Sequence, residues 1–222
     1  MAKENAPELL LRAAAKGKLA GKRIYLSPNT DPYVPEERQW RITRHLLEFF
    51  RKYPPALLVI QTRSPSILDD LDLLTQMRPF VVVGVSISTD REEVRKVLEP
   101  RCPPIAARLA ALQALHSAGI TTQASLAPLL PCDARVLAEA VTGHCDWVVA
   151  QPLKGGGRGA RTWVPALRLV EQHGWQGWLD GGAEVRQTLG TLRALLGERF
   201  WEGQEGFALP WLSGNSVRTR GI

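Results

Sequence analysis

The sequence has few cysteines, and their spacing matches no common metal site. Its 222 residues include three cysteines, Cys102, Cys132 and Cys145, and no two of them form a CxxC pair. Neither a zinc site nor a disulfide framework is therefore indicated. An odd number of unpaired cysteines is typical of a reducing compartment, so we expect a cytoplasmic protein.

Long apolar runs are also missing. The longest run lies around residues 80–87, whereas a helix that crosses a bilayer needs about 20 apolar residues. The first residues, Met1 to Asn5, include an acid and lack the hydrophobic region of a secretory signal. We therefore expect no membrane partner.

The motifs of several enzyme classes are absent. The sequence contains no GxSxG, HExxH or GxxxxGK(S/T) motif, which argues against a serine hydrolase elbow, a zincin helix and a P-loop. No GxGxxG opens the first strand–helix unit, so a dinucleotide-binding fold has little support. No acid–base pair stands out either, which disfavours a barrel enzyme that works without a cofactor.

The charge balance is mildly basic. The chain carries 28 Lys and Arg against 22 Asp and Glu, a formal net charge of +6, which is compatible with nucleic acid but does not require it. Four of the seven tryptophans follow residue 170. They could stack on bases, but packing against the domain is the favoured interpretation.

Strand and helix patterns alternate along the chain. Apolar runs begin near residues 24, 57, 81, 121 and 146, and a helical pattern follows each of them. This alternation predicts an α/β fold with a parallel sheet and outer helices. Polar residues recur directly after the strands, which is typical of a partial (β/α) TIM-type barrel with its site at the carboxyl ends of the strands. We expect the barrel to span residues 1–198, followed by an irregular tail at 199–222.

Three polar stretches have both a functional and a structural interpretation. The turn-rich Ser27–Pro32 follows the first strand and either holds a ligand or caps the next helix, which we predict over residues 35–52. The glycines at 155–159 could cradle a phosphate, although a flexible connection is favoured. Glu99, Arg101 and Arg108 could form a clamp near a site, but their spacing favours a solvated charge group.

Five segments resemble the radical S-adenosylmethionine (radical SAM) proteins of the DNA-repair-photolyase type, relatives of spore photoproduct lyase. They are NTDPYVPEERQWRITRHLLEF at 29–49, IQTRSPSILDDLDLL at 60–74, VSIST at 85–89, LEPRCPPIAARLAALQALHSAGI at 98–120 and ASLAPLLP at 124–131. The resemblance extends over most of residues 3–150, and these segments follow the family's order and spacing. Any one of these segments alone would be a weak signal.

The resemblance implies a partial barrel that holds S-adenosylmethionine (AdoMet) and a 4Fe–4S cluster at the strand ends. An external electron donor would reduce the cluster, which cleaves AdoMet to a deoxyadenosyl radical. Asp31, with Thr30, matches the pair that holds the methionine amino group, and Arg63 matches the partner of its carboxylate. The cofactor-binding residues implied in this way are Asn29, Thr30, Asp31, Arg63, Ser86, Ser88 and Pro128.

The sequence departs from this family at the cluster. The family's three cysteines form CxxxCxxC after the first strand, and this motif is absent; by resemblance, the first strand–helix unit is missing. Thiolates are the usual ligands of such clusters, so we expect this chain by itself to be inactive, with no catalytic or metal-binding residue of its own. The alternative is a non-catalytic module that binds nucleic acid or protein, which the tryptophan-rich tail and the basic glycine loop favour.

Overall fold

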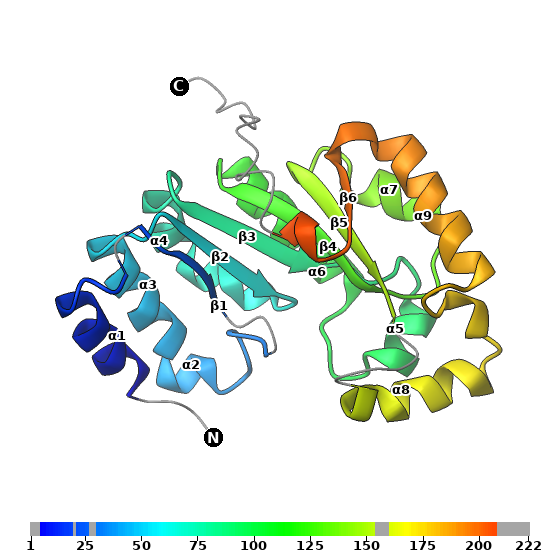
Figure 1. The fold of residues 1–222 in the computed structure, drawn as a ribbon, viewed down its shortest axis with the longest axis horizontal. Helices are drawn as coiled ribbons and strands as arrows, with labels where there is room; N and C mark the ends of the chain where they lie inside the picture. The colour runs from blue at the N-terminus through cyan, green and yellow to red at the C-terminus, as the bar shows by residue number, and fades with distance from the viewer. Residues whose placement is uncertain (1–4, 20, 27–29, 154–159, 208–222) are drawn as a thin grey trace.

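Six strands form a single parallel sheet whose order in space is their order in the chain (Figure 1). The computed structural model describes residues 5–19, 21–26, 30–153 and 160–207. The strands are β1 (Arg23–Leu26), β2 (Leu57–Thr62), β3 (Val81–Ser86), β4 (Thr121–Leu129), β5 (Trp147–Pro152) and β6 (Phe200–Glu202). This confirms the predicted α/β fold with a parallel sheet and flanking helices.

Helices connect the strands. They are α1 (Ala6–Ala15), α2 (Glu37–Trp40), α3 (Ile42–Lys52), α4 (Leu71–Gln76), α5 (Glu92–Leu98), α6 (Ile105–Ser117), α7 (Ala134–Val141), α8 (Ala160–Gln172) and α9 (Ala183–Leu196). Short 3-10 helices lie at η1 (Pro65–Asp70), η2 (Gln176–Trp178), η3 (Gly197–Arg199) and η4 (Gln204–Phe207). In the described residues, no helix is both long enough and apolar enough to span a bilayer.

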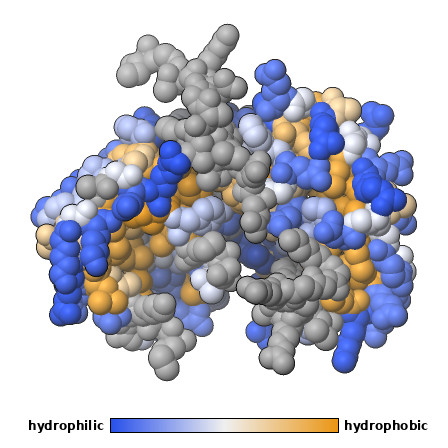
Figure 2. All heavy atoms as spheres, viewed as in Figure 1, coloured by the Kyte–Doolittle hydropathy of each residue, from blue (hydrophilic) through white to orange (hydrophobic). Residues whose placement is uncertain are grey.

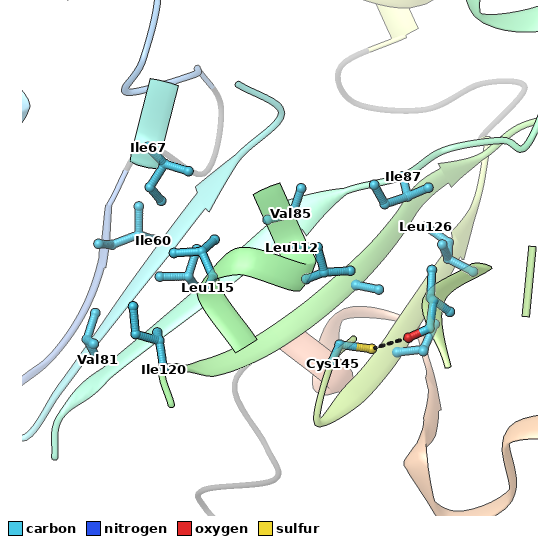
Figure 3. Close-up of a cluster of buried hydrophobic side chains, with 14 of the residues drawn as sticks. Ile60, Ile67, Val81, Val85, Ile87, Leu112, Leu115, Ile120, Leu126 and Cys145 are labelled. Carbon is cyan, nitrogen blue, oxygen red and sulfur yellow. Dashed lines mark hydrogen bonds between the residues drawn. The ribbon is translucent and has the colours of Figure 1, made fainter. Parts of the chain in front are cut away.

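The main core lies between one face of the sheet and the helices. Every residue of β3 is buried, as expected for a central parallel strand that is covered on both sides. Figure 3 shows Leu112 and Leu115 of α6 directed toward Val85 and Ile60 of the sheet, and all four side chains are buried. The apolar residues on this face therefore hold the helix layer in place.

The other face of the sheet has a smaller core and a polar row. Val59, Val82 and Trp147 pack together there, and the Trp147 indole donates to the carbonyl of Gly206 in η4 at 3.1 Å. Toward the carboxyl ends of the strands, this face carries Gln61, Ser86, Gln123 and Ser125, which we call the polar row. A sheet with helices on one face and this polar row on the other matches the wall of a barrel.

Two elements differ from the sequence prediction. The helix expected over residues 35–52 is broken at Arg41, whose left-handed backbone separates α2 from α3. Phe200–Glu202, assigned to the irregular tail, instead form β6, which pairs with β5. A three-residue segment is too short to show the alternating hydrophobic pattern of a strand. It becomes a strand because it pairs with the edge of β5.

Three of the four tryptophans after residue 170 pack against the domain, as predicted. Trp175, Trp178 and Trp201 each lie partly buried against core residues. In the space-filling view, apolar side chains gather between the more hydrophilic outer surfaces (Figure 2). Trp211 and the glycines at 155–159 lie outside the described residues.

A glycine in β3 makes room for a side chain of the polar row. Gln61 on β2 accepts from the Tyr25 hydroxyl at 3.2 Å and donates to the Ser86 hydroxyl at 3.0 Å. A methyl group at Gly84 would overlap the Gln61 amide oxygen. Only glycine leaves this space while Gln61 keeps both of its partners.

We expect Gly84→Ala to lower the free energy of unfolding by about 1–3 kcal/mol, because the added methyl overpacks the sheet. Denaturant unfolding measures this change. The matched control is Gly190→Ala in α9, where the methyl meets no atom within 4 Å; it should stabilise the chain by about 0.5–1 kcal/mol. The overlap between the added methyl and Gln61 would be contradicted if Gly84→Ala left the free energy of unfolding unchanged. It would also be contradicted if Gly84→Ala were equally destabilising in a chain that carries Gln61→Ala.

Candidate functional site

The carboxylate of Asp31 joins the loops after β1 and β2. Its Oδ1 accepts from the Tyr33 amide at 2.9 Å and from the Thr62 hydroxyl at 2.6 Å. Its Oδ2 accepts from the Arg63 amide at 2.8 Å. The carboxyl ends of parallel neighbours lie at the same edge of the sheet, so a short acidic side chain reaches both loops. The result is a fixed negative charge at this edge.

The side chain of Arg63 runs from this edge toward the loop after α5. Its Nη1 lies 3.5 Å from Glu99 Oε1 and 3.4 Å from the sulfur of Cys102. Burial lowers the pKa of Arg63, but the neighbouring Cys102 and Glu99 more than offset this effect, so its pKa lies above the ordinary value. The Arg63 side chain remains 39% exposed. Its guanidinium is therefore anchored yet reachable from solvent.

A buried ion pair lies behind Arg63. Glu99 Oε2 is 2.9 Å from Arg108 Nη1, and the two side chains are 7% and 1% exposed. Arg108 also donates to the carbonyls of Ser86 and Pro103, and the Ser88 hydroxyl donates to Glu99 at 3.2 Å. The pair thus connects α6 to the end of β3 and to the loops around it.

This pair corrects the sequence interpretation of Glu99, Arg101 and Arg108. The spacing favours a solvated charge group, but in the structure Glu99 and Arg108 are buried and only Arg101 of the three is exposed. The sequence does contain a signal for it. In α6 the buried Ile105, Arg108, Leu112 and Leu115 share one helix face, so Arg108 occupies a core position. A cation at such a position needs a buried partner.

Two buried polar groups beside the site lack a protein partner among the described residues. They are Nη2 of Arg108 and the side-chain amide of Gln123 on β4. Gln123 lies opposite Gly84 in the sheet register, next to the polar row. Buried groups of this kind are rare and costly in native proteins unless water or a ligand satisfies them. Hydrogen-bonding capacity is therefore left over at this end of the sheet.

The structure brings four of the predicted site residues into one network. Asp31 bonds to Arg63, and Arg63 and Ser88 both meet Glu99, which pairs with the Arg108 that contacts the Ser86 carbonyl. Ser86 and Ser88 are 4% and 1% exposed, and their hydroxyls are bonded to Gln61 and Glu99. Their contact with a ligand therefore stays a prediction.

Two other predicted residues lie outside this network. Thr30 precedes Asp31 and is exposed, and Pro128 is half-buried near the end of β4. Asn29 lies outside the described residues. The sequence interpretation missed Tyr33 and Thr62, which hold the Asp31 carboxylate, because their role depends on contacts between separate loops.

The cysteines of the described residues do not fit a 4Fe–4S cluster. Burial raises the pKa of Cys132 and of Cys145 to about 12, and each is 5% exposed. Cys102 lies apart from them, beside Arg63. Within the described ranges, no group of three or more His, Cys, Asp and Glu residues could hold a metal ion. No reaction step through such a cluster follows from these residues.

The chain is similar to two curated proteins, both named as uncharacterized. Protein ORF301 of Acidianus two-tailed virus is 36% identical over 112 residues, which cover 50% of this chain and 36% of that protein. Protein MJ0683 of Methanocaldococcus jannaschii is 34% identical over 129 residues, which cover 58% and 47%. The matches thus span less than half the length of either relative. No family model matches the chain.

Among solved structures, the fold is similar to spore photoproduct lyase. The enzyme complexed with dinucleoside spore photoproduct has a TM-score of 0.59 at 14% identity, over 90% of this chain and 65% of that chain. A double mutant with bound AdoMet and the same dinucleoside has a TM-score of 0.60 at 15% identity, over 89% and 66%. At this level of identity the likeness shows the fold alone.

We expect Glu99→Gln to lower the free energy of unfolding by about 3–5 kcal/mol, because it leaves the buried Arg108 without a counter-charge. The matched control is Glu202→Gln, which removes an exposed pair with Arg193 and should change stability by less than about 1 kcal/mol. Urea unfolding compares the two variants. Equal effects would contradict the importance of the buried pair.

We expect one cysteine of the native chain to react with a disulfide reagent at pH 8. Cys132 and Cys145 are buried with a thiol pKa of about 12, so almost none of either is thiolate at that pH. Cys102 is partly exposed. Spectroscopic thiol titration should give about one equivalent, and Cys102→Ser should abolish it. Reaction of all three cysteines without denaturant would overturn the burial argument.

Proposed function

We propose that this chain carries the AdoMet-binding site of a radical SAM protein related to spore photoproduct lyase. The observation that carries the proposal is that the Asp31 carboxylate accepts from the Arg63 backbone amide, so that a carboxylate and a partly exposed guanidinium belong to adjoining loops at the carboxyl ends of β1 and β2. The fold is similar to that of an enzyme solved with bound AdoMet. The family resemblance of residues 29–131 supports the same function.

The two charges are complementary to the amino acid end of AdoMet. An ammonium group requires an anionic, hydrogen-bonding partner, which Asp31 offers. A carboxylate is best bound by a guanidinium, which Arg63 offers with 39% of its side chain exposed. Residues Asn29, Thr30, Ser86, Ser88 and Pro128 complete the proposed site. These residues bind and orient the ligand and supply no acid–base chemistry of their own.

AdoMet would supply a sulfonium whose reductive cleavage gives a deoxyadenosyl radical. That reaction needs a 4Fe–4S cluster and an electron donor, and the described cysteines do not fit the cluster. We therefore propose binding for this chain, and radical chemistry only for a protein or complex that brings the cluster ligands. Its substrate would be a nucleic acid, as the solved relative with a dinucleoside photoproduct suggests.

A second candidate is a nucleic-acid-binding module without AdoMet chemistry. The net charge of +6 favours it, since basic proteins attract phosphate backbones. Salt-dependent DNA binding without AdoMet binding would support this candidate. The two candidates differ in the ligand that Arg63 contacts: AdoMet in the first and nucleic acid in the second.

Calorimetric titration of the chain with AdoMet tests the proposal. We expect binding, and we expect Arg63→Gln to weaken it by about tenfold or more, because a charge-assisted bond is lost. This variant keeps the backbone amide that bonds Asp31. The same substitution should leave methylthioadenosine binding unchanged, since that analogue lacks the amino acid group. Asp31→Asn should also weaken AdoMet binding.

Asp180→Asn is the control, because Asp180 is exposed and remote in sequence from the site. A thermal melt of each variant checks that the fold is intact. If the wild-type chain bound no AdoMet at millimolar concentration, or if Arg63→Gln weakened both ligands equally, the proposed site would be wrong.

A further inference from the structure

The break between α2 and α3 places an arginine where glycine is favoured. Arg41 has φ 49° and ψ 32°, and among the described residues it is the one non-glycine residue with positive φ. This left-handed conformation costs conformational free energy for any residue with a Cβ, and glycine most often occupies it at helix ends. Strained backbone of this kind is concentrated at functional sites. The side chain of Arg41 is therefore the feature to explain.

That side chain lines a pocket of about 240 Å³. Arg38 and Arg44 line it as well, together with Tyr33 and Ser66. Pockets for drug-sized molecules begin at roughly 300 Å³, so this one suits a smaller group. Three arginines, one from α2, one from the break and one from α3, thus line this small pocket.

Arg44 is already neutralised by acids. Its Nη1 lies 2.7 Å from Asp70 Oδ1, and its Nη2 lies 2.8 Å from Asp72 Oδ2. Asp70 accepts from the Tyr33 hydroxyl as well, at 3.0 Å. Glu37, another lining acid, accepts from the Thr43 amide, and burial raises its pKa. Arg44 and Asp70 thus neutralise each other in the wall of the pocket, whereas Glu37 has no cationic partner among the described residues.

The lining charges without an ion pair among the described residues are the cations Arg38 and Arg41 and the acids Glu37 and Asp69. Neither Arg38 nor Arg41 forms an ion pair with a described residue. Two cations and two carboxylates therefore line the pocket beside the Arg44 ion pairs, and of these only the cations can donate hydrogen bonds to a phosphate. A pair of guanidinium groups binds phosphate well, because each group can donate two parallel hydrogen bonds.

We propose that Arg38 and Arg41 bind a phosphate group at this pocket, and that the phosphate belongs to a single-stranded nucleic acid. Trp40 lies between them in sequence, on α2, and is 43% exposed. An exposed aromatic ring between basic residues is typical of surfaces where a base stacks beside a bound phosphate. The net charge of +6 favours the same ligand.

The pocket is connected to the candidate site through one residue. Tyr33 donates its amide to Asp31 and its hydroxyl to Asp70, so the loop after β1 carries both places. A strand bound at Arg41 would lie next to the proposed AdoMet site. Phosphate binding itself does not depend on AdoMet, so the two proposals can fail separately.

The test is binding of a fluorescent oligothymidylate to the whole chain, measured by anisotropy at several salt concentrations. We expect Arg41→Gly to weaken binding by about tenfold and to reduce the salt slope by about 0.7, the value for one lost phosphate contact on a single strand. The melting temperature of this variant should equal or exceed that of the wild type, because glycine relieves the backbone. Arg38→Ala should weaken binding similarly, and Asp69→Asn should tighten it.

Arg135→Ala is the matched control, since Arg135 is exposed on α7 and outside the pocket; it should leave binding unchanged. Trp40→Ala should weaken oligothymidylate binding but not the binding of inorganic phosphate, which is titrated separately. Binding of phosphate without oligothymidylate would assign the pocket to free phosphate and overturn the nucleic-acid part. Equal binding by wild type and Arg41→Gly would overturn the whole proposal. Arg63→Gln should not affect oligothymidylate binding, which separates this site from the AdoMet site.

Discussion

The buried ion pair between Glu99 and Arg108 is the contact on which the candidate site depends. Both charges are removed from water, and each is compensated mainly by the other, since desolvating a single charge costs several kcal/mol. The pair must therefore form whenever the chain is folded. Because Glu99 also holds the Ser88 hydroxyl and faces Arg63, this requirement fixes the loop after β2 in place. The position of Arg63 is thus a consequence of core electrostatics.

Charges of alternating sign continue outward from this pair. Glu99 pairs with the buried Arg108 and faces the Arg63 guanidinium, and the backbone amide of Arg63 donates to the Asp31 carboxylate. The Arg63 guanidinium therefore has an acidic neighbour in Glu99, and its side chain remains 39% exposed. The Tyr33 loop then links this series to a second one, in which Asp70 lies between Tyr33 and Arg44. The loop after β1 therefore contacts two polar regions, one around Asp31 and the other around Asp70.

The sequence predicted the strands well and the charged groups poorly, for a physical reason in each case. Runs such as Val81–Ser86 are buried on both faces, and their continuous apolar pattern marks them without reference to the rest of the chain. The break at Arg41 was not recognisable in the sequence, because arginine is a good helix former. Its left-handed backbone depends on how α2 and α3 pack. The strand Phe200–Glu202 was missed because three residues form it only when the edge of β5 is present.

The sequence by itself determined the α/β class, the start of five strands and the positions of Asp31 and Arg63 after two of them. These features follow from local hydrophobic patterns and from the order of elements, which are written along the chain. Only the tertiary structure decided which polar residues meet. Glu99 and Arg108 are nine positions apart and Asp31 and Arg63 are thirty-two apart, and no local pattern encodes such distances. Their contacts arise because parallel strands bring successive loops to one edge, where buried charges must find partners.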